Sequence, residues 1–160
     1  MKIKMNLIRR KNAAVNFSSD YIQLKIDAQD WQESLRLTAV PLLEHGDIDK
    51  AYIDHMIDAV KTLGPYIVIA PGLALGHARP DKSVRNTAIA IATLDHPVNF
   101  GSSANDPVDI IVVLAAKDNN SHIVLLQKIV ALLNQEHGFE LIRGAQTQTD
   151  KEKIAQLLNE

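Results

Sequence analysis

The chain has 160 residues, of which 46% are hydrophobic and 22% are charged. This length and composition predict one globular domain with one core, and they exclude the class of disordered proteins that combine low hydrophobicity with high charge. The formal net charge is −2. No basic field is therefore available to hold a nucleic-acid backbone, and nucleic acid is disfavoured as the main partner.

The sequence contains no cysteine, which excludes disulfides, thiolate nucleophiles and zinc–thiolate sites. Residues 1–16 are basic and are predicted to be an N-terminal extension or a first helix. They lack the uninterrupted apolar stretch of a signal peptide, and no run of the chain reaches the ~18 apolar residues of a transmembrane helix. A cytoplasmic protein with its main domain over residues 17–160 is expected.

An amphipathic helix is predicted to follow Asp27, which would cap it. Pro41 falls inside this helix and is expected to bend it, while Gly46 supplies the stop. The segment Tyr21–Ile26 alternates in the way of a strand ahead of it. The inward residues of the helix recur at three- and four-residue spacing, at Trp31, Leu35, Ala39 and Leu42.

A second helix is predicted to begin near Asp47 or Asp49 and to end at Gly64-Pro65. Two helices in tandem therefore precede the main run of strands. The inward face of this second helix is formed by Tyr52, Met56, Val60 and Leu63.

The middle of the chain reads as strands separated by turns. Pro71-Gly72 breaks the first strand from the second, and Asp95-His96-Pro97 is expected to be a turn after the third. The fourth strand, VDIIVVLA, is almost continuously apolar, which predicts that helices cover both of its faces. The four strands are expected at Tyr66–Ala70, Leu73–Leu75, Thr87–Leu94 and Val108–Ala115.

Three helices are predicted to complete the chain. A long one runs from about Ser121 to Leu133 and is capped by Asn119, Asn120 or Ser121. A short one ends at Gly144, and the last begins with Thr149 and Glu152 at capping-box spacing. The long helix is expected to turn inward Ile123, Leu126, Val130 and Leu133. Helices before, between and after the strands predict an α/β domain, with a small mixed sheet and helices on both faces.

Histidines are the candidate reactive side chains. His77 follows an apolar strand in a stretch rich in Pro and Gly, and Arg79 can offer a fork of donors to phosphate oxygens. His122 lies in the first turn of a predicted helix, where the dipole favours a neutral ring that can donate to an anion. The remaining four are interpreted as structural or surface residues: His45, His55, His96 and His137.

Other catalytic signatures are missing from the sequence, including a GxSxG elbow, a Walker loop, a GxGxxG after a strand and an HExxH motif. A metal site that uses His77 and His122 stays as a minor alternative, because no nearby spacing supplies obvious further ligands.

Four segments carry a resemblance to a known family: GPYIVIAPGLALGHARP, TAIAIATL, NDPVDIIVVLAA and NNSHIVLLQKIVALL. They resemble the EIIA components of the bacterial sugar phosphotransferase system, of the mannitol/fructose type and nearest the ascorbate-specific branch. The similarity runs from about Phe17 to the end of the chain. It implies the mannitol-type EIIA fold and a phosphoryl carrier of the phosphotransferase class.

The resemblance also implies roles and partners. The histidine that matches His77 accepts a phosphoryl group from the carrier protein HPr and passes it to a cysteine of an EIIB component, which serves the EIIC membrane permease. The histidine that matches His122 helps to hold the phosphoryl group. No metal or organic cofactor is implied. Since the chain has no cysteine, EIIB must be a separate protein.

Two departures from the family pattern bear on the site. Gly76 stands where the family has a proline, which predicts a more mobile loop before a partner binds. The family's arginine in the preceding helix has no counterpart in Met56–Val60, and Arg79 is the expected substitute. A regulatory module phosphorylated on His77 is the main alternative function. The sequence leaves open whether the protein forms a homodimer.

Overall fold

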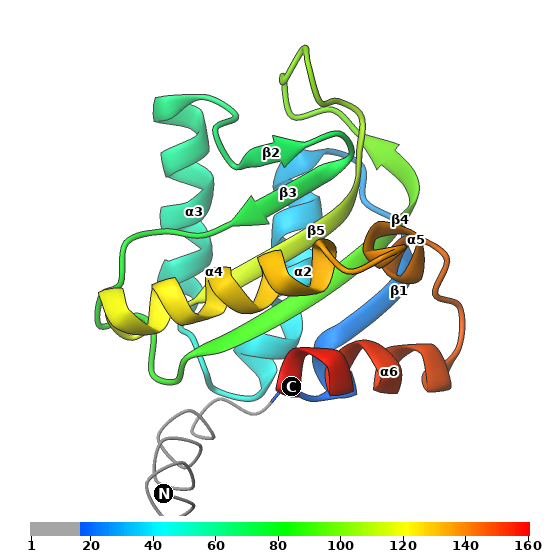
Figure 1. Cartoon of the computed structure of the whole chain (residues 1–160). Helices are drawn as coiled ribbons and strands as arrows, with labels where there is room; N and C mark the ends of the chain where they lie inside the picture. The colour runs from blue at the N-terminus through cyan, green and yellow to red at the C-terminus, as the bar shows by residue number, and fades with distance from the viewer. Residues whose placement is uncertain (1–16) are drawn as a thin grey trace, which may run out of the picture.

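The frame of the molecule is a mixed five-stranded sheet in the order β1-β4-β5-β3-β2 (Figure 1). β1 pairs parallel with β4 and β3 pairs parallel with β5, whereas the β4–β5 and β2–β3 pairs are antiparallel. The computed structural model describes residues 17–160, so the prediction for residues 1–16 lies outside the described residues. The strands are β1 (Ile22–Ile26), β2 (Val68–Ala70), β3 (Leu73–Gly76), β4 (Ala88–Val98) and β5 (Val108–Ala115).

Helices cover both faces of this sheet, as the sequence predicts (Figure 1). α2 and α3 pack on one face, and α4, α5 and α6 pack on the other. Their bounds are α2 (Trp31–Glu44), α3 (Lys50–Leu63), α4 (Asn119–Leu133), α5 (Gly138–Arg143) and α6 (Gln148–Asn159), and a short 3-10 helix, η1 (Ser19–Tyr21), precedes β1. Within residues 17–160, no helix is both long enough and apolar enough to cross a bilayer.

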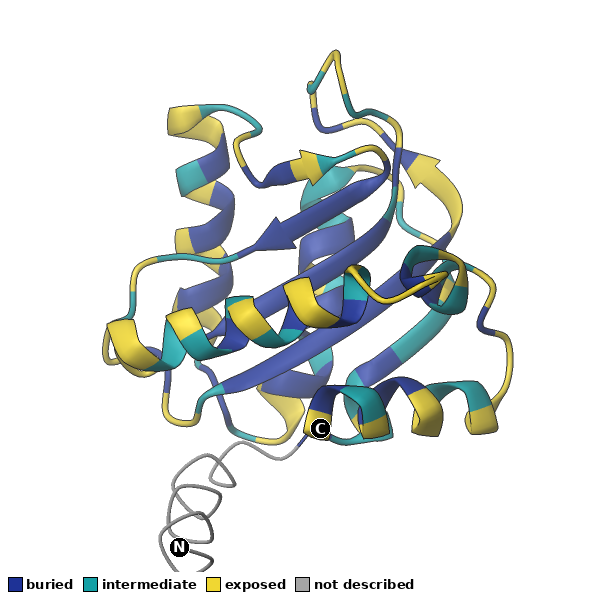
Figure 2. Cartoon of the chain, viewed as in Figure 1, coloured by how far each residue is buried: buried dark blue, intermediate teal, exposed yellow. Residues whose placement is uncertain are grey.

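The continuous apolar run of β5 has the expected cause. Ile111 and Val113 point into the core under α2 and α3, and Ile110 and Val112 point into the core under α4 to α6. All four side chains are fully buried, and β5 lies in the middle of the buried sheet in Figure 2. A central strand that is covered twice needs an apolar residue at every position.

The alternation of Ala and Ile in β4 separates the two cores. Ala88 and Ala90 face α2 and α3, whereas Ile89 and Ile91 face α4 to α6. Small side chains let α2 approach the sheet closely. Gly76 at the end of β3 continues this surface, because a Cβ atom there would lie 2.8 Å from Cδ2 of Leu35 on α2.

The helix caps differ from the predicted ones. α2 is capped by Asp30, whose side chain accepts from the Glu33 amide, and not by Asp27. α4 is capped by Asp118, whose side chain accepts from the Ser121 amide. In α6 the capping box joins Thr147 and Asp150, two residues before the predicted pair Thr149 and Glu152. Each error has the same origin, because several side chains with suitable acceptors fall within one turn of each helix start.

The predicted turn at Asp95-His96-Pro97 is wrong, because β4 continues through it to Val98, which pairs with Val108 after a shift of register. These three residues are exposed, so the polar run marks an exposed stretch of strand.

Two predicted helix faces are also partly wrong. Leu63, the last residue of α3, is 70% exposed. In α4, Ile123 and Val130 are exposed, because apolar residues surround most of this helix and periodicity alone does not choose a face. The residues of α4 that are buried are Leu125, Ile129 and Leu132.

We expect Gly76→Ala to lower the free energy of unfolding by about 1–3 kcal/mol, because the added methyl group overpacks a closed core. Urea denaturation would measure the loss. The same change in a Leu35→Ala background should cost less, since the side chain that it meets is gone. Equal costs in the two backgrounds would show that the contact with Leu35 is not the cause.

Candidate functional site

His77 is the first residue after β3, at the end of the sheet where the parallel strands β3 and β5 finish. Gly76 pairs with Val113, so the chain leaves the sheet immediately before the histidine. His77 itself is partly buried. His77 therefore lies at the carboxyl end of the strand, in a loop of the kind that often carries functional residues.

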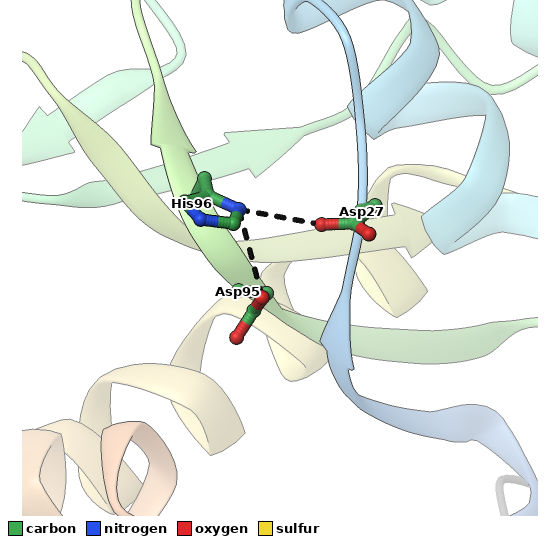
Figure 3. Close-up of side chains that lie close together, drawn as sticks. All are labelled: Asp27, Asp95 and His96. Atoms are coloured by element: carbon green, nitrogen blue, oxygen red, sulfur yellow. Dashed lines mark hydrogen bonds and ion pairs between the residues drawn. The ribbon is translucent and has the colours of Figure 1, made fainter.

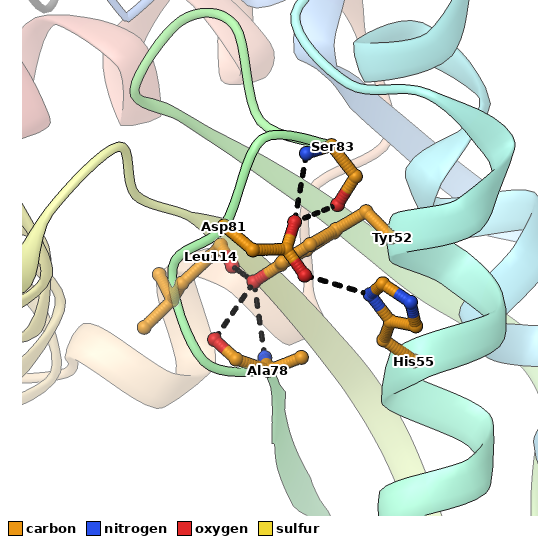
Figure 4. A network of polar contacts seen from close by, with 6 residues as sticks. All are labelled: Tyr52, His55, Ala78, Asp81, Ser83 and Leu114. Carbon is orange, nitrogen blue, oxygen red and sulfur yellow. Dashed lines mark hydrogen bonds and ion pairs between the residues drawn. The ribbon is translucent and has the colours of Figure 1, made fainter.

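The loop that follows His77 is anchored by a buried tyrosine. The Ala78 amide donates to the Tyr52 hydroxyl at 3.0 Å, and this hydroxyl donates to the Leu114 carbonyl at 2.6 Å (Figure 4). Tyr52 is only 1% exposed, and burial raises its pKa to about 12. The hydroxyl stays protonated near neutral pH and links α3, the His77 loop and the end of β5.

The ring of His77 has a defined tautomer. Its Nδ1 lies 2.9 Å from the carbonyl oxygen of Leu75. A carbonyl oxygen can only accept, so Nδ1 carries the hydrogen of this bond. In the neutral ring Nε2 is then unprotonated, and its lone pair can act as a nucleophile.

Two aromatic rings flank His77. The ring of His122 lies with its centroid 5.2 Å away, and Tyr66 meets His77 edge-on at 5.7 Å. His122 belongs to the first turn of α4, which brings the helix N-terminus to the same place. Burial lowers the pKa of His122, and the positive charge of a protonated His77 lowers it further. Both effects favour the neutral form of the His122 ring.

These residues border a cleft with a volume of about 520 Å³. The structure thus brings together the three residues that the sequence singles out, since His77, His122 and Arg79 all line it. Arg79 is exposed. Asn119, the first residue of α4, also borders the cleft, and helix geometry leaves its amide without a carbonyl one turn earlier in the helix.

His55 also lines this cleft, although the sequence interpretation set it aside as structural or solvent-facing. Its Nδ1 lies 3.0 Å from Oδ2 of Asp81, four residues after His77 (Figure 4). The signal that could have found it is spacing: His55 follows Tyr52 by three residues and precedes Ala59 by four, so the three share one side of α3.

The other histidines lie apart from the cleft. His45 bonds through Nδ1 to the Pro41 carbonyl at the end of its own helix, and His137 is a surface residue at the start of α5. Both agree with the predicted structural or surface roles.

His96 is 81% exposed and lies beside Asp27 and Asp95 at the far end of β4 (Figure 3). Within residues 17–160, these three side chains are the one group whose ligand atoms could share a metal ion. Strand register places them at the end of the sheet opposite His77. The described residues therefore offer no third ligand for a metal on His77 and His122.

Comparison with known proteins gives one family. Residues 16–160 match the model of the phosphoenolpyruvate-dependent sugar phosphotransferase system, EIIA 2. The chain is 34% identical over 151 residues to the ascorbate-specific PTS system EIIA component of Escherichia coli strain K12, with 94% of this chain and 92% of the relative covered.

Solved structures agree with this match. The mannitol-specific cryptic phosphotransferase enzyme IIA of Escherichia coli superposes with a TM-score of 0.78 at 31% identity, over 87% of this chain and 94% of that one. The enzyme IIA of the Escherichia coli mannitol system, solved in complex with phosphorylated enzyme IIB, gives a TM-score of 0.77 at 20% identity, over 89% and 98% of the two chains. The second likeness shows the fold alone.

Replacing Tyr52 by Phe removes the hydroxyl that serves both Ala78 and Leu114. We expect a loss of about 1–3 kcal/mol in the free energy of unfolding, because two backbone groups lose their partner in the interior. Hydrogen exchange at the Ala78 amide should also become faster. The matched control is Tyr66→Phe, since Tyr66 is 42% exposed and its hydroxyl has no hydrogen-bond partner among residues 17–160. An equal effect in the control would contradict the anchoring role.

Proposed function

The chain belongs to the EIIA 2 family of the phosphoenolpyruvate-dependent sugar phosphotransferase system, and on that premise we propose that it carries a phosphoryl group on Nε2 of His77 between HPr and a separate EIIB protein. A phosphotransfer role follows from the family. What we propose beyond the family is that His77 carries the phosphoryl group, that HPr donates it and that EIIB accepts it. The observation that carries it is the Nδ1 hydrogen bond to Leu75, which leaves Nε2 as the nucleophile beside an open cleft.

The proposed chemistry balances as two displacements at phosphorus. In the first, Nε2 of His77 attacks the phosphoryl group, the bond between phosphorus and its donor atom on HPr breaks, and an N–P bond forms. In the second, a cysteine thiolate of EIIB attacks, the N–P bond breaks and an S–P bond forms. The proton on Nδ1 stays there in both steps, hydrogen-bonded to the Leu75 carbonyl, so the ring leaves as neutral imidazole.

Three groups around the cleft support this transfer. The neutral ring of His122 can donate one hydrogen bond to a phosphoryl oxygen, and the N-terminus of α4 favours a bound anion. Arg79 can add a charged fork of donors from the loop. Positioning and charge stabilisation are the main demands of phosphoryl transfer, and side chains can meet both.

The acceptor and the sugar are proposed from relatives. One structural neighbour is a complex of enzyme IIA with phosphorylated enzyme IIB, and we assign the same kind of partner to this chain. The curated relative is named ascorbate-specific, so ascorbate or a related sugar acid is the proposed transported substrate. A cytoplasmic location and indirect service of a membrane permease complete the proposal.

Intact-mass spectrometry after incubation with phosphoenolpyruvate, Enzyme I and HPr tests the proposal. We expect one phosphoryl group on the wild type and none on His77→Gln, which lacks the nucleophile. His122→Gln should still accept, but roughly tenfold more slowly, equivalent to about 1.4 kcal/mol in the barrier. Samples must stay non-acidic, because phosphohistidine is labile in acid.

Nuclear magnetic resonance of the phosphorylated ring should place the phosphorus on Nε2. Phosphorylation of His77→Gln at the wild-type level would refute the assignment of the residue. Acceptance by the wild type, followed by failure to transfer to any EIIB cysteine, would instead favour the regulatory alternative.

A further inference from the structure

We propose that His55 is a third imidazole of the phosphoryl site, a cation held by Asp81 that donates a hydrogen bond to the phosphoryl oxygens on His77. This inference rests on the proposed function and extends it to a residue on a different element, α3. It starts from one juxtaposition: His55 on α3 and His77 after β3 line the same cleft.

Asp81 is a fixed and ionised partner for His55. One carboxylate oxygen faces Nδ1 of His55 at 3.0 Å, and the other accepts the Ser83 amide at 2.7 Å and the Ser83 hydroxyl (Figure 4). The hydrogen bond from the Ser83 hydroxyl lowers the pKa of Asp81 most, and the Ser83 amide and His55 lower it further. The carboxylate therefore stays charged and keeps its orientation.

The charges in the cleft favour a cation beside the phosphoryl group. A phosphoryl group adds close to two negative charges at neutral pH, and Asp81 already contributes one to the same cleft. Burial lowers the pKa of His122, which favours a neutral ring in the cleft before the phosphoryl group arrives. Arg79 is the permanent cation among the lining residues, and His55, in contact with the Asp81 carboxylate, is placed to supply a second.

The hydrogen-bonding pattern of the ring agrees with this role. Since Asp81 can only accept, Nδ1 of His55 is the donor in their contact. In a neutral ring Nε2 would then carry a lone pair and no proton, whereas a protonated ring donates from both nitrogens. With a phosphoryl group on His77, the ring has an anion for each nitrogen. His77 differs, because its Nδ1 is paired with an uncharged carbonyl and its Nε2 is left to react.

A purely structural role is the rival explanation, in which His55 only ties α3 to the loop through Asp81. Two substitutions separate the explanations. His55→Gln keeps an amide donor for Asp81 but has no charge, and His55→Arg keeps both the donor and the charge. His96→Gln is the matched control, because His96 is also an exposed histidine beside aspartates, at the opposite end of the sheet.

The experiment measures the rate of phosphoryl acceptance in single turnovers, with phosphorylated HPr in one series and the small-molecule donor phosphoramidate in another. We expect His55→Gln to be about fivefold slower than wild type with both donors, a modest effect because the ion pair is partly exposed. His55→Arg should retain about half of the wild-type rate or more. His96→Gln should match the wild type.

The outcomes keep the two proposals apart. Acceptance by His55→Gln at the rate of His96→Gln would overturn the role of His55 and leave the carrier function standing. Equal slowing of His55→Gln and His55→Arg would favour the structural rival. Failure of the wild type with HPr but not with phosphoramidate would refute the carrier function, while the small-molecule series would still decide the role of His55. Failure with both donors would refute both proposals.

Discussion

The buried hydroxyl of Tyr52 is the contact on which the geometry of the cleft depends. Beyond Gly76 the chain leaves β3, so the Ala78 amide is not matched by a ladder partner on β5. The Tyr52 hydroxyl, on α3, accepts a hydrogen bond from this amide and donates one to the Leu114 carbonyl near the end of β5. The pKa of about 12 keeps the hydroxyl uncharged, so this anchor does not depend on the charges that enter the cleft.

The core beneath the cleft brings these elements close enough to be joined. The face of the sheet under α2 and α3 includes the small residues Ala88 and Ala90, and Gly76 presents only hydrogen toward Leu35. The same face of the sheet carries α3, from which Tyr52 reaches both the loop and the end of β5. The glycine before His77, which the sequence suggests as a source of mobility, is therefore also a packing requirement. Its effect on motion stays a prediction.

Apolar periodicity and strand order predicted the layers and the doubly covered strand, because they determine these features. The nearness of His77 and His122 was expected from the family resemblance, and the structure brings the two rings together. The sequence predictions failed where several neighbouring residues could fill the same role. Asp27 was predicted to cap α2, but Asp30, another acceptor near the helix start, is the cap. The exposed polar residues near the end of β4 were predicted to be a turn, but the strand continues through them to Val98. Spacing places His55 on the side of α3 that carries Tyr52 and Ala59, but its partner Asp81 comes within 3.0 Å only in the folded chain.

The three histidines of the cleft show how one residue type can serve different roles through its partners. A carrier must release the phosphoryl group as readily as it accepts it. A carboxylate behind the nucleophile would stabilise a protonated ring, which cannot attack, whereas the Leu75 carbonyl only fixes the tautomer. The carboxylate lies instead behind His55, where a charge suits binding, and burial lowers the pKa of His122, which favours its neutral ring. The acceptor at each Nδ1, more than the imidazole itself, separates the proposed nucleophile from the proposed cation.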